Sequence, residues 1–226
     1  MSNLTLVIPA KSEALSLPIV LKELDKFDYH IFVVLEETDN ETIDAIKGHN
    51  CKIIYQKNKG YGDALIEGIN KVNTEYFCIF NADGSFNPQE IKSMIEKLEE
   101  KSLDIVFASR YQKFAGSEDD TIVTLIGNYF FSLLGKIFFN LNISDILYTF
   151  VLGKTKSVSS LNLLRKDFTF CVELPIKSKK ANQTIASIGS YERPRIAGKK
   201  KVNAIRDGFL ILRYMIYLFF NLKFNK

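Results

Sequence analysis

The chain of 226 residues contains no tryptophan, only two histidines and only three cysteines. Cys51, Cys78 and Cys171 stand in apolar runs that lack the C-x-x-C or Cys/His spacing of a metal site. We therefore expect three reduced cysteines in the core of a cytosolic protein. The two histidines lie outside every motif described below, and we assign them no role.

The sequence also lacks an internal repeat, a low-complexity stretch and a linker rich in proline and serine. No basic segment followed by a long apolar run stands at its N-terminus, which argues against a signal peptide. With 46% hydrophobic residues, the chain is long enough for one large α/β domain with a proper core. We expect a cytoplasmic protein with one domain of catalytic size.

Arginine is absent from the first 100 residues, where ten lysines face 17 acidic residues. Residues 190–226 reverse this balance, with nine basic residues against two acids. A basic, aromatic-rich end favours an anionic partner, either lipid headgroups or phosphates, over nucleic acid. The alternative is a basic end that is merely solvated.

Short β-prone runs alternate with segments of helical period over the first half of the chain, which predicts a mostly parallel sheet covered by helices. The predicted strands are Leu4–Pro9, His30–Leu35, Cys51–Tyr55, Tyr76–Phe80 and Asp104–Ala108. The predicted helices are Leu17–Lys26, Glu41–Lys47, Gly62–Val72 and Pro88–Lys101. Polar residues follow four of these strands, so we expect a cleft along one edge of the sheet.

The stretch Tyr76–Pro88 is central to this cleft, because its apolar run stops at Asn81-Ala82-Asp83-Gly84. The run reads as a buried strand, Gly84 permits a turn, and Pro88 is suited to the first turn of the next helix. Asp83 is therefore expected at the carboxyl end of a strand, where open α/β sheets bind ligands.

Two later segments are unusually apolar. Between 121 and 141, five polar residues recur every fourth position and would form one narrow stripe on an apolar helix. We expect one or two helices there at a membrane interface, with a helix buried in a protein core as the alternative. Residues 205–226 are aromatic and basic, which favours attachment to anionic lipid over docking on the domain or in a dimer.

Four motifs resemble, in order and spacing, the nucleotide-sugar half of family 2 glycosyltransferases of the GT-A fold. They are VIPAKSEALSLPIVLKEL, VVLEETDNET, NKGYGDALIEGI and FNADGSFNPQEI. Later segments resemble dolichyl-phosphate mannosyltransferases and polyprenyl-phosphate glycosyltransferases: SRY, ISDILYTFVLGK, FTFCVEL and RPRIAGKKKVNAIRDG. The resemblance implies a GT-A domain over residues 1–204, followed by a membrane-associating helix over 205–226.

The resemblance also implies which residues bind the nucleotide sugar. Glycines before a helix let backbone N–H groups approach a diphosphate, and carboxylates beyond a strand accept hydrogen bonds from ribose or base. The residues implied are Pro9, Ala10, Glu13, Glu36, Glu37, Lys59, Gly60, Gly62, Asn81 and Ala82. Glutamates stand at 36 and 37 where the family usually has aspartates, so the base preference stays open.

Asn81-Ala82-Asp83 occupies the family's D-x-D position, which implies Mg²⁺ or Mn²⁺ bound by Asp83, Asn81 and Ser85. Such a metal neutralises charge on the departing nucleoside diphosphate. The first aspartate of that motif is Asn81 here, which lowers the expected metal affinity.

Basic residues are implied for the acceptor, because guanidinium groups hold phosphate bidentately. Arg110, Arg195 and Lys201 match these positions. Asp145 matches an acid that could orient acceptor or sugar, so the implied catalytic set is Asp83, Asp145 and Arg110. Glu173 matches a later acid in a strand-like run and could equally be structural.

Together these features predict an inverting transferase that moves a sugar from a UDP- or GDP-linked donor to a polyprenyl phosphate at the cytoplasmic membrane face. One alternative is a family 2 transferase that acts on a glycan hydroxyl and needs a base such as Asp145. Another is a degenerate subunit that binds sugar nucleotides without catalysis.

Overall fold

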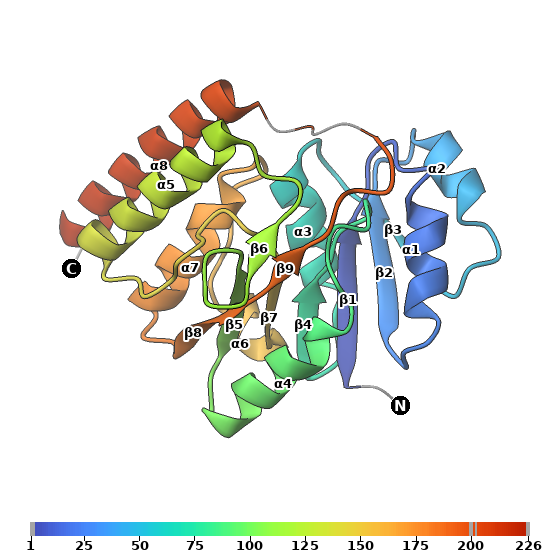
Figure 1. Ribbon diagram of the computed structural model, residues 1–226, viewed down its shortest axis with the longest axis horizontal. Coiled ribbons are helices and arrows are strands. Elements are labelled where there is room, and N and C mark those ends of the chain that lie inside the picture. Colours follow the sequence, from blue (N-terminus) through green and yellow to red (C-terminus); the bar gives the residue numbers. More distant parts are fainter. Residues whose placement is uncertain (1–2, 199–200, 202, 225–226) are drawn as a thin grey trace.

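The computed structural model describes residues 3–198, 201 and 203–224, and it has a seven-stranded sheet between two layers of helices (Figure 1). The strands run in the order β3-β2-β1-β4-β7-β5-β8, and only β7 is antiparallel to its neighbours. In chain order they are β1 (Leu4–Pro9), β2 (His30–Leu35), β3 (Lys52–Tyr55), β4 (Tyr76–Ile79), β5 (Ile105–Ser109), β7 (Val151–Lys154) and β8 (Ile185–Gly189). The expected mostly parallel α/β sheet is confirmed.

Side chains alternate between the two faces of the strands and so build two cores. In β1, Val7 faces one core, while Leu6 and Ile8 face the other. The core that contains Leu6 and Ile8, called the second core, is covered by α1 (Leu17–Leu24), α2 (Asn40–Ala45) and α4 (Glu90–Glu100). The first is covered by α3 (Tyr61–Ile69), α5 (Ile122–Phe139), α6 (Thr155–Ser159), α7 (Phe170–Lys180) and α8 (Ala204–Phe224).

Every predicted strand is present within one residue of its predicted ends. Pro88 lies just before α4, which begins at Glu90, so it does not open the helix as expected. The prediction that Phe168–Leu174 is strand-like is wrong, because most of this segment belongs to the helix α7. Every residue of α7 from Phe170 to Ile176 is buried, and such a run has no periodicity that separates helix from strand.

α5 is a single helix that buries two residues of its polar stripe, Asn128 and Ser132, whereas Lys136 and Asn140 are exposed. Asn128 donates to the hydroxyl of Tyr111 at 2.8 Å, and the hydroxyl of Ser132 accepts from the backbone N–H of Ile146 at 3.0 Å. The exposed face is otherwise mostly apolar, with large side chains on Ile122, Val123, Ile126, Tyr129, Phe130, Leu133, Ile137 and Phe138. By length and composition α5 could also cross a membrane.

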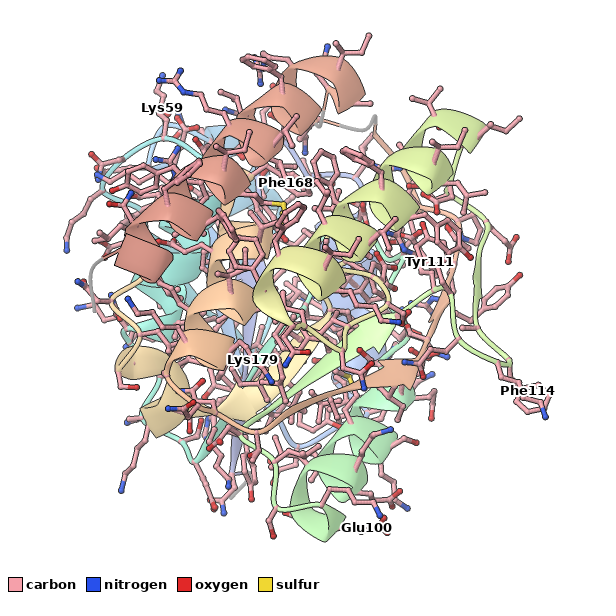
Figure 2. The ribbon with its side chains drawn as sticks, turned by 90° about the vertical axis from the view of Figure 1, so that its left-hand side faces the viewer. Lys59, Glu100, Tyr111, Phe114, Phe168 and Lys179 are labelled. Atoms are coloured by element: carbon pink, nitrogen blue, oxygen red, sulfur yellow. The ribbon has the colours of Figure 1, made fainter. Side chains whose placement is uncertain are left out.

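α8 lies alongside α5 on the same side of the molecule (Figures 1 and 2). Its residues Ile211, Met215 and Leu218 belong to the first core, so α8 is packed on the domain and is not a separate appendage. Its other face exposes large apolar side chains, which are Ile205, Phe209, Ile216, Tyr217 and Phe220. Residues 225 and 226 of the predicted C-terminal helix lie outside the described residues.

A two-stranded sheet sits beside the main sheet and positions two loops. It pairs β6 (Gly116–Ser117) with β9 (Tyr191–Glu192) in parallel. The chain leaving β9 crosses the carboxyl ends of the central strands toward the loop after β1 (Figure 1). Backbone hydrogen bonds tie this segment to the turn after β4: Arg193 donates to the carbonyl of Ser85, and Ile196 donates to that of Asp83, both at 2.8 Å.

Candidate active site

A cavity of about 790 Å³ opens where β1, β2 and β4 end, as expected for an open α/β sheet. Its first walls come from the loops after β1 and β2 and include Pro9, Ala10, Glu13 and Glu36. Glu13 accepts a hydrogen bond from the hydroxyl of Ser16 at 2.6 Å. These four predicted nucleotide-binding residues are thus brought together at one edge of the sheet.

Two other predicted nucleotide-binding residues lie outside this wall. Glu37 is exposed and does not line the cavity beside Glu36, which instead pairs with Lys11 at 3.0 Å. Lys59 is also exposed, and its side chain points away from the molecule (Figure 2). The structure therefore gives no support to Lys59 as an additional cation at a diphosphate.

The glycine loop before α3 packs closely against the loop 165–167. A Cβ atom on Gly60 would overlap the carbonyl oxygen of Lys166, and one on Gly62 would overlap that of Arg165. The backbone N–H of Asp63, in the first turn of α3, donates to the carbonyl of Lys166 at 3.1 Å. Both glycines admit the loop 165–167, and Gly60 also lines the cavity, so their contact with a diphosphate stays a prediction.

The turn after β4 presents Asp83 to the cavity. Gly84 has φ +83°, and a Cβ there would overlap the side chain of Ile196, so glycine is required. Asn81 donates to the hydroxyl of Ser85, and its oxygen accepts from the backbone N–H of Phe86 at 3.3 Å. Asn81 and Ser85 therefore stabilise the turn, and both line the cavity beside Asp83, the carboxylate of this predicted metal site.

Arg195 lies between two carboxylates on the cavity wall. Its Nη1 is 3.5 Å from Oδ2 of Asp83, and its Nη2 donates to Oδ2 of Asp119 at 3.0 Å. The hydrogen bond to Asp119 outweighs burial and, with the charge of Asp83, raises the pKa of Arg195. Lys201, the other predicted acceptor residue, also lines the cavity and pairs with Glu13.

Arg110, predicted to bind the acceptor phosphate, lines the cavity and is held there by three carboxylates. It binds Asp145 through Nε at 2.7 Å and Nη2 at 3.0 Å, while Nη1 donates to Asp120 at 3.3 Å and Glu192 at 3.2 Å. Its ring partner is Tyr148, 4.5 Å from the guanidinium carbon. Burial opposes the charge, but Asp145 outweighs it and raises the pKa of Arg110.

Asp145 and Glu173 are structural acids in this fold. The carboxylate of Asp145 is 0% exposed and fully engaged with Arg110, so it is not available as a base or as a sugar contact. Glu173 is equally buried, and it accepts from the backbone N–H groups of Leu164 and Arg165 and from the hydroxyl of Tyr214. It ties α7 and the loop before it to α8.

Sequence reasoning missed several cavity residues. Asp119 and Asp120 come from the loop after β6, which matches no motif, and only their shared acidity could have drawn attention to them. Tyr61 and Thr149 meet on the cavity wall, with their hydroxyl oxygens 2.6 Å apart. Thr149 lies within the segment ISDILYTFVLGK, from which only Asp145 was singled out.

The cavity also has an apolar end between α5 and α8. Val123, Ile126 and Phe130 of α5 line it, as do Ile205 and Leu210 of α8. Phe168, from the loop before α7, lies between these two helices (Figure 2). One continuous cavity therefore joins a polar site at the sheet edge to an apolar passage between two helices.

The charge of the lining bears on whether a metal fits. Eight acidic side chains line the cavity against five basic ones, so an anionic diphosphate would meet a net negative wall. Among the described residues, no group of three or more His, Cys, Asp or Glu side chains is arranged to hold a metal ion. Mg²⁺ is commonly held by one or two carboxylates together with substrate phosphates, and the Asp83 site fits that pattern.

Comparisons with known proteins agree with this architecture. The Glycosyl transferase family 2 profile matches residues 5–161. An uncharacterized glycosyltransferase of Mycobacterium tuberculosis is 24% identical over 207 residues, which cover 92% of this chain and 93% of the relative.

Two groups of solved structures share the fold. Glucosyl-3-phosphoglycerate synthase from Mycobacterium tuberculosis, in complex with Mn²⁺, uridine diphosphate and phosphoglyceric acid, superposes with a TM-score of 0.75. The identity is 13%, and the match covers 97% of this chain and 78% of that one. Mannosyl-3-phosphoglycerate synthase from Rubrobacter xylanophilus gives a TM-score of 0.69 at 15% identity, over 98% of this chain and 74% of that one.

Proposed function

Because the chain belongs to glycosyltransferase family 2, we propose that it transfers a sugar, with inversion, from a nucleoside diphosphate sugar to a polyprenyl phosphate. The observation that carries this proposal is the two-part cavity. Its polar end suits a nucleotide sugar and a phosphate, whereas its apolar end between α5 and α8 suits an isoprenoid chain. A small polar acceptor would have no use for that apolar passage.

The donor would lie against the loops after β1 and β2, with Glu13 and Glu36 as acceptors for ribose or base hydrogen bonds. Asp83 would hold a divalent cation, Mg²⁺ or Mn²⁺, which supplies charge neutralisation for the departing diphosphate. The net negative lining supports this requirement. Structural relatives bind Mn²⁺ or Mg²⁺ together with uridine diphosphate, although they share too little sequence to identify this chain's donor.

The acceptor's phosphate oxygen is already an anionic nucleophile, so little help from a general base is required. Arg195 and Lys201 are the cavity cations suited to hold that phosphate, in line with their expected role. Attack on the anomeric carbon by this oxygen breaks the bond to the diphosphate and forms a new phosphate–sugar bond. No proton is transferred in this step, so no base is needed and Asp145 can remain paired with Arg110.

Attachment to the membrane is part of the proposal. α5 buries Asn128 and Ser132 of its polar stripe and exposes most of its large apolar side chains, which is the reverse of an ordinary surface helix. α8 adds exposed aromatic residues and Arg206 and Arg213 on the same side. A combined apolar and basic surface of this kind favours the interface of an anionic membrane, where a polyprenyl phosphate is found.

The test is a transfer assay with purified full-length protein, Mn²⁺ and radiolabelled UDP- or GDP-linked hexoses. Three acceptor conditions are compared: polyprenyl phosphate in detergent, phosphoglycerate, and no acceptor. We expect label in the organic phase only with polyprenyl phosphate, and none with Asp83→Ala.

Label transferred to phosphoglycerate instead would overturn the lipid acceptor while keeping the transferase. Absence of transfer to any acceptor would favour the subunit that binds sugar nucleotides without catalysis.

A further inference from the structure

The pair of carboxylates around Arg195 points to a residue that no motif identifies. We infer that Asp83 and Asp119 together bind the donor's divalent cation, and that Arg195 occupies this carboxylate pair until the cation arrives. The inference rests on the proposed function, because that function supplies the cation and the diphosphate. It adds Asp119 as a second protein ligand of the cation. It also gives Arg195 two successive partners, which are the carboxylate pair and then the acceptor phosphate.

The geometry around Arg195 supports a shared cation site. Asp83 and Asp119 come from loops far apart in the sequence, yet both contact one guanidinium: Asp83 lies 3.5 Å from Nη1, and Asp119 accepts from Nη2 at 3.0 Å and from Nε at 3.4 Å. All three side chains line the cavity and are largely buried, with 18%, 17% and 22% of Asp83, Asp119 and Arg195 exposed. The guanidinium of Arg195 therefore already lies between Asp119 and Asp83, the last residue of the Asn81-Ala82-Asp83 motif.

The position of Asp119 is fixed by the small sheet. β6 ends at Ser117, whose hydroxyl accepts from the backbone N–H of Asp119 at 3.1 Å. β9, its partner, leads directly into the segment that carries Arg195. The backbone bond from Ile196 to the carbonyl of Asp83 brings the same segment to the turn after β4. The three groups are thus held together by backbone structure and not by a chance surface contact.

Competition follows from charge and ligand preference. Mg²⁺ and Mn²⁺ carry twice the charge of a guanidinium and prefer carboxylate and phosphate oxygens, so both carboxylates would favour the cation once a diphosphate completes its ligands. Arg195 would then lose its two partners at once. Because it remains on the cavity wall, it becomes available to the acceptor phosphate.

Direct measurement of Mn²⁺ binding tests this inference without relying on activity. Free Mn²⁺ is followed by electron paramagnetic resonance during titration of the full-length protein, with UDP and, separately, with GDP. We expect Asp119→Asn to weaken Mn²⁺ binding at least about tenfold. Arg195→Gln should strengthen it about threefold, because a competing cation is removed.

Matched control variants distinguish direct Mn²⁺ binding by Asp119 from a general effect of changing one charge near the cavity. Glu118→Gln removes an exposed acid next to Asp119, and Arg193→Gln removes a cation of the same segment that pairs with Glu23 at 2.8 Å. Both should change Mn²⁺ affinity less than twofold. Thermal unfolding of each variant checks that the fold is retained.

The outcomes distinguish this inference from the proposed function. If Asp119→Asn binds Mn²⁺ as tightly as the native chain while Asp83→Asn does not, Asp119 is no ligand, and sugar transfer still stands. Equal gains from Arg193→Gln and Arg195→Gln would overturn the competition. The transfer assay decides the proposed function independently of both results.

Discussion

The outward-facing apolar side of α5 predicts that a few exposed side chains control membrane binding. Leu133 and Ile137 lie one turn apart on that side, and neither lines the cavity. We expect the double variant Leu133→Ser with Ile137→Ser to release the protein from anionic vesicles. α8 is a poor target for deletion because Ile211, Met215 and Leu218 are part of the core.

The magnitude follows from the exposed fractions. Leu133 is 53% exposed and Ile137 is 62% exposed, so roughly half of each side chain remains to be buried in lipid. Complete burial of such a side chain is worth about 1.5–3 kcal/mol, which leaves about 1 kcal/mol for each exposed half. The pair therefore contributes about 2 kcal/mol, and its loss should lower the partition coefficient by about thirtyfold.

Co-sedimentation with vesicles of neutral and anionic lipid measures this partition coefficient. The matched control is Leu15→Ser with Ile19→Ser, which removes two side chains that are 76% and 52% exposed at α1, a helix on the other face of the sheet. This control should bind vesicles as the native chain does. Equal binding by the Leu133/Ile137 variant and the native chain would refute the assignment of this face to the membrane.

Two further predictions concern the structural roles found around the cavity. Asp145→Asn leaves Arg110 without its main buried partner and should lower the free energy of unfolding in urea by about 3 kcal/mol; native stability with lost turnover would instead restore a catalytic role. Gly62→Ala should cost about 1–3 kcal/mol, because its Cβ overlaps the carbonyl of Arg165, whereas Gly127→Ala has open space and should not destabilise. Thermal unfolding of both glycine variants decides between packing and phosphate contact.

The strands were predictable because their sequences and surroundings agree. β1 and β2 are short apolar runs buried on both faces and bounded by polar loops, which is the pattern of a central parallel strand. α7 was not predictable in the same way. Its residues 170–176 are all buried and include Pro175, so neither periodicity nor propensity indicated a helix.

Site residues were predictable from the sequence only where the residues next to them in the chain define their position. Asp83 follows a strand and precedes a turn glycine, and that local pattern was enough to place it in the cavity. Arg110 and Asp145 also looked functional, but their roles depend on each other across the fold, and each neutralises the other. Asp119 stands in no motif, because its importance arises only when the small sheet brings it to Arg195.

The segment after β9 connects the two halves of the proposed reaction. Arg193 and Ile196 hydrogen-bond to the turn that carries Asp83, while Lys201 reaches Glu13 in the first loop. The groups suited to the acceptor phosphate are thus attached to the loops suited to the donor. A donor that shifts the turn at Asp83 must also shift Arg195, so the two binding steps are expected to be coupled through this segment and not independent.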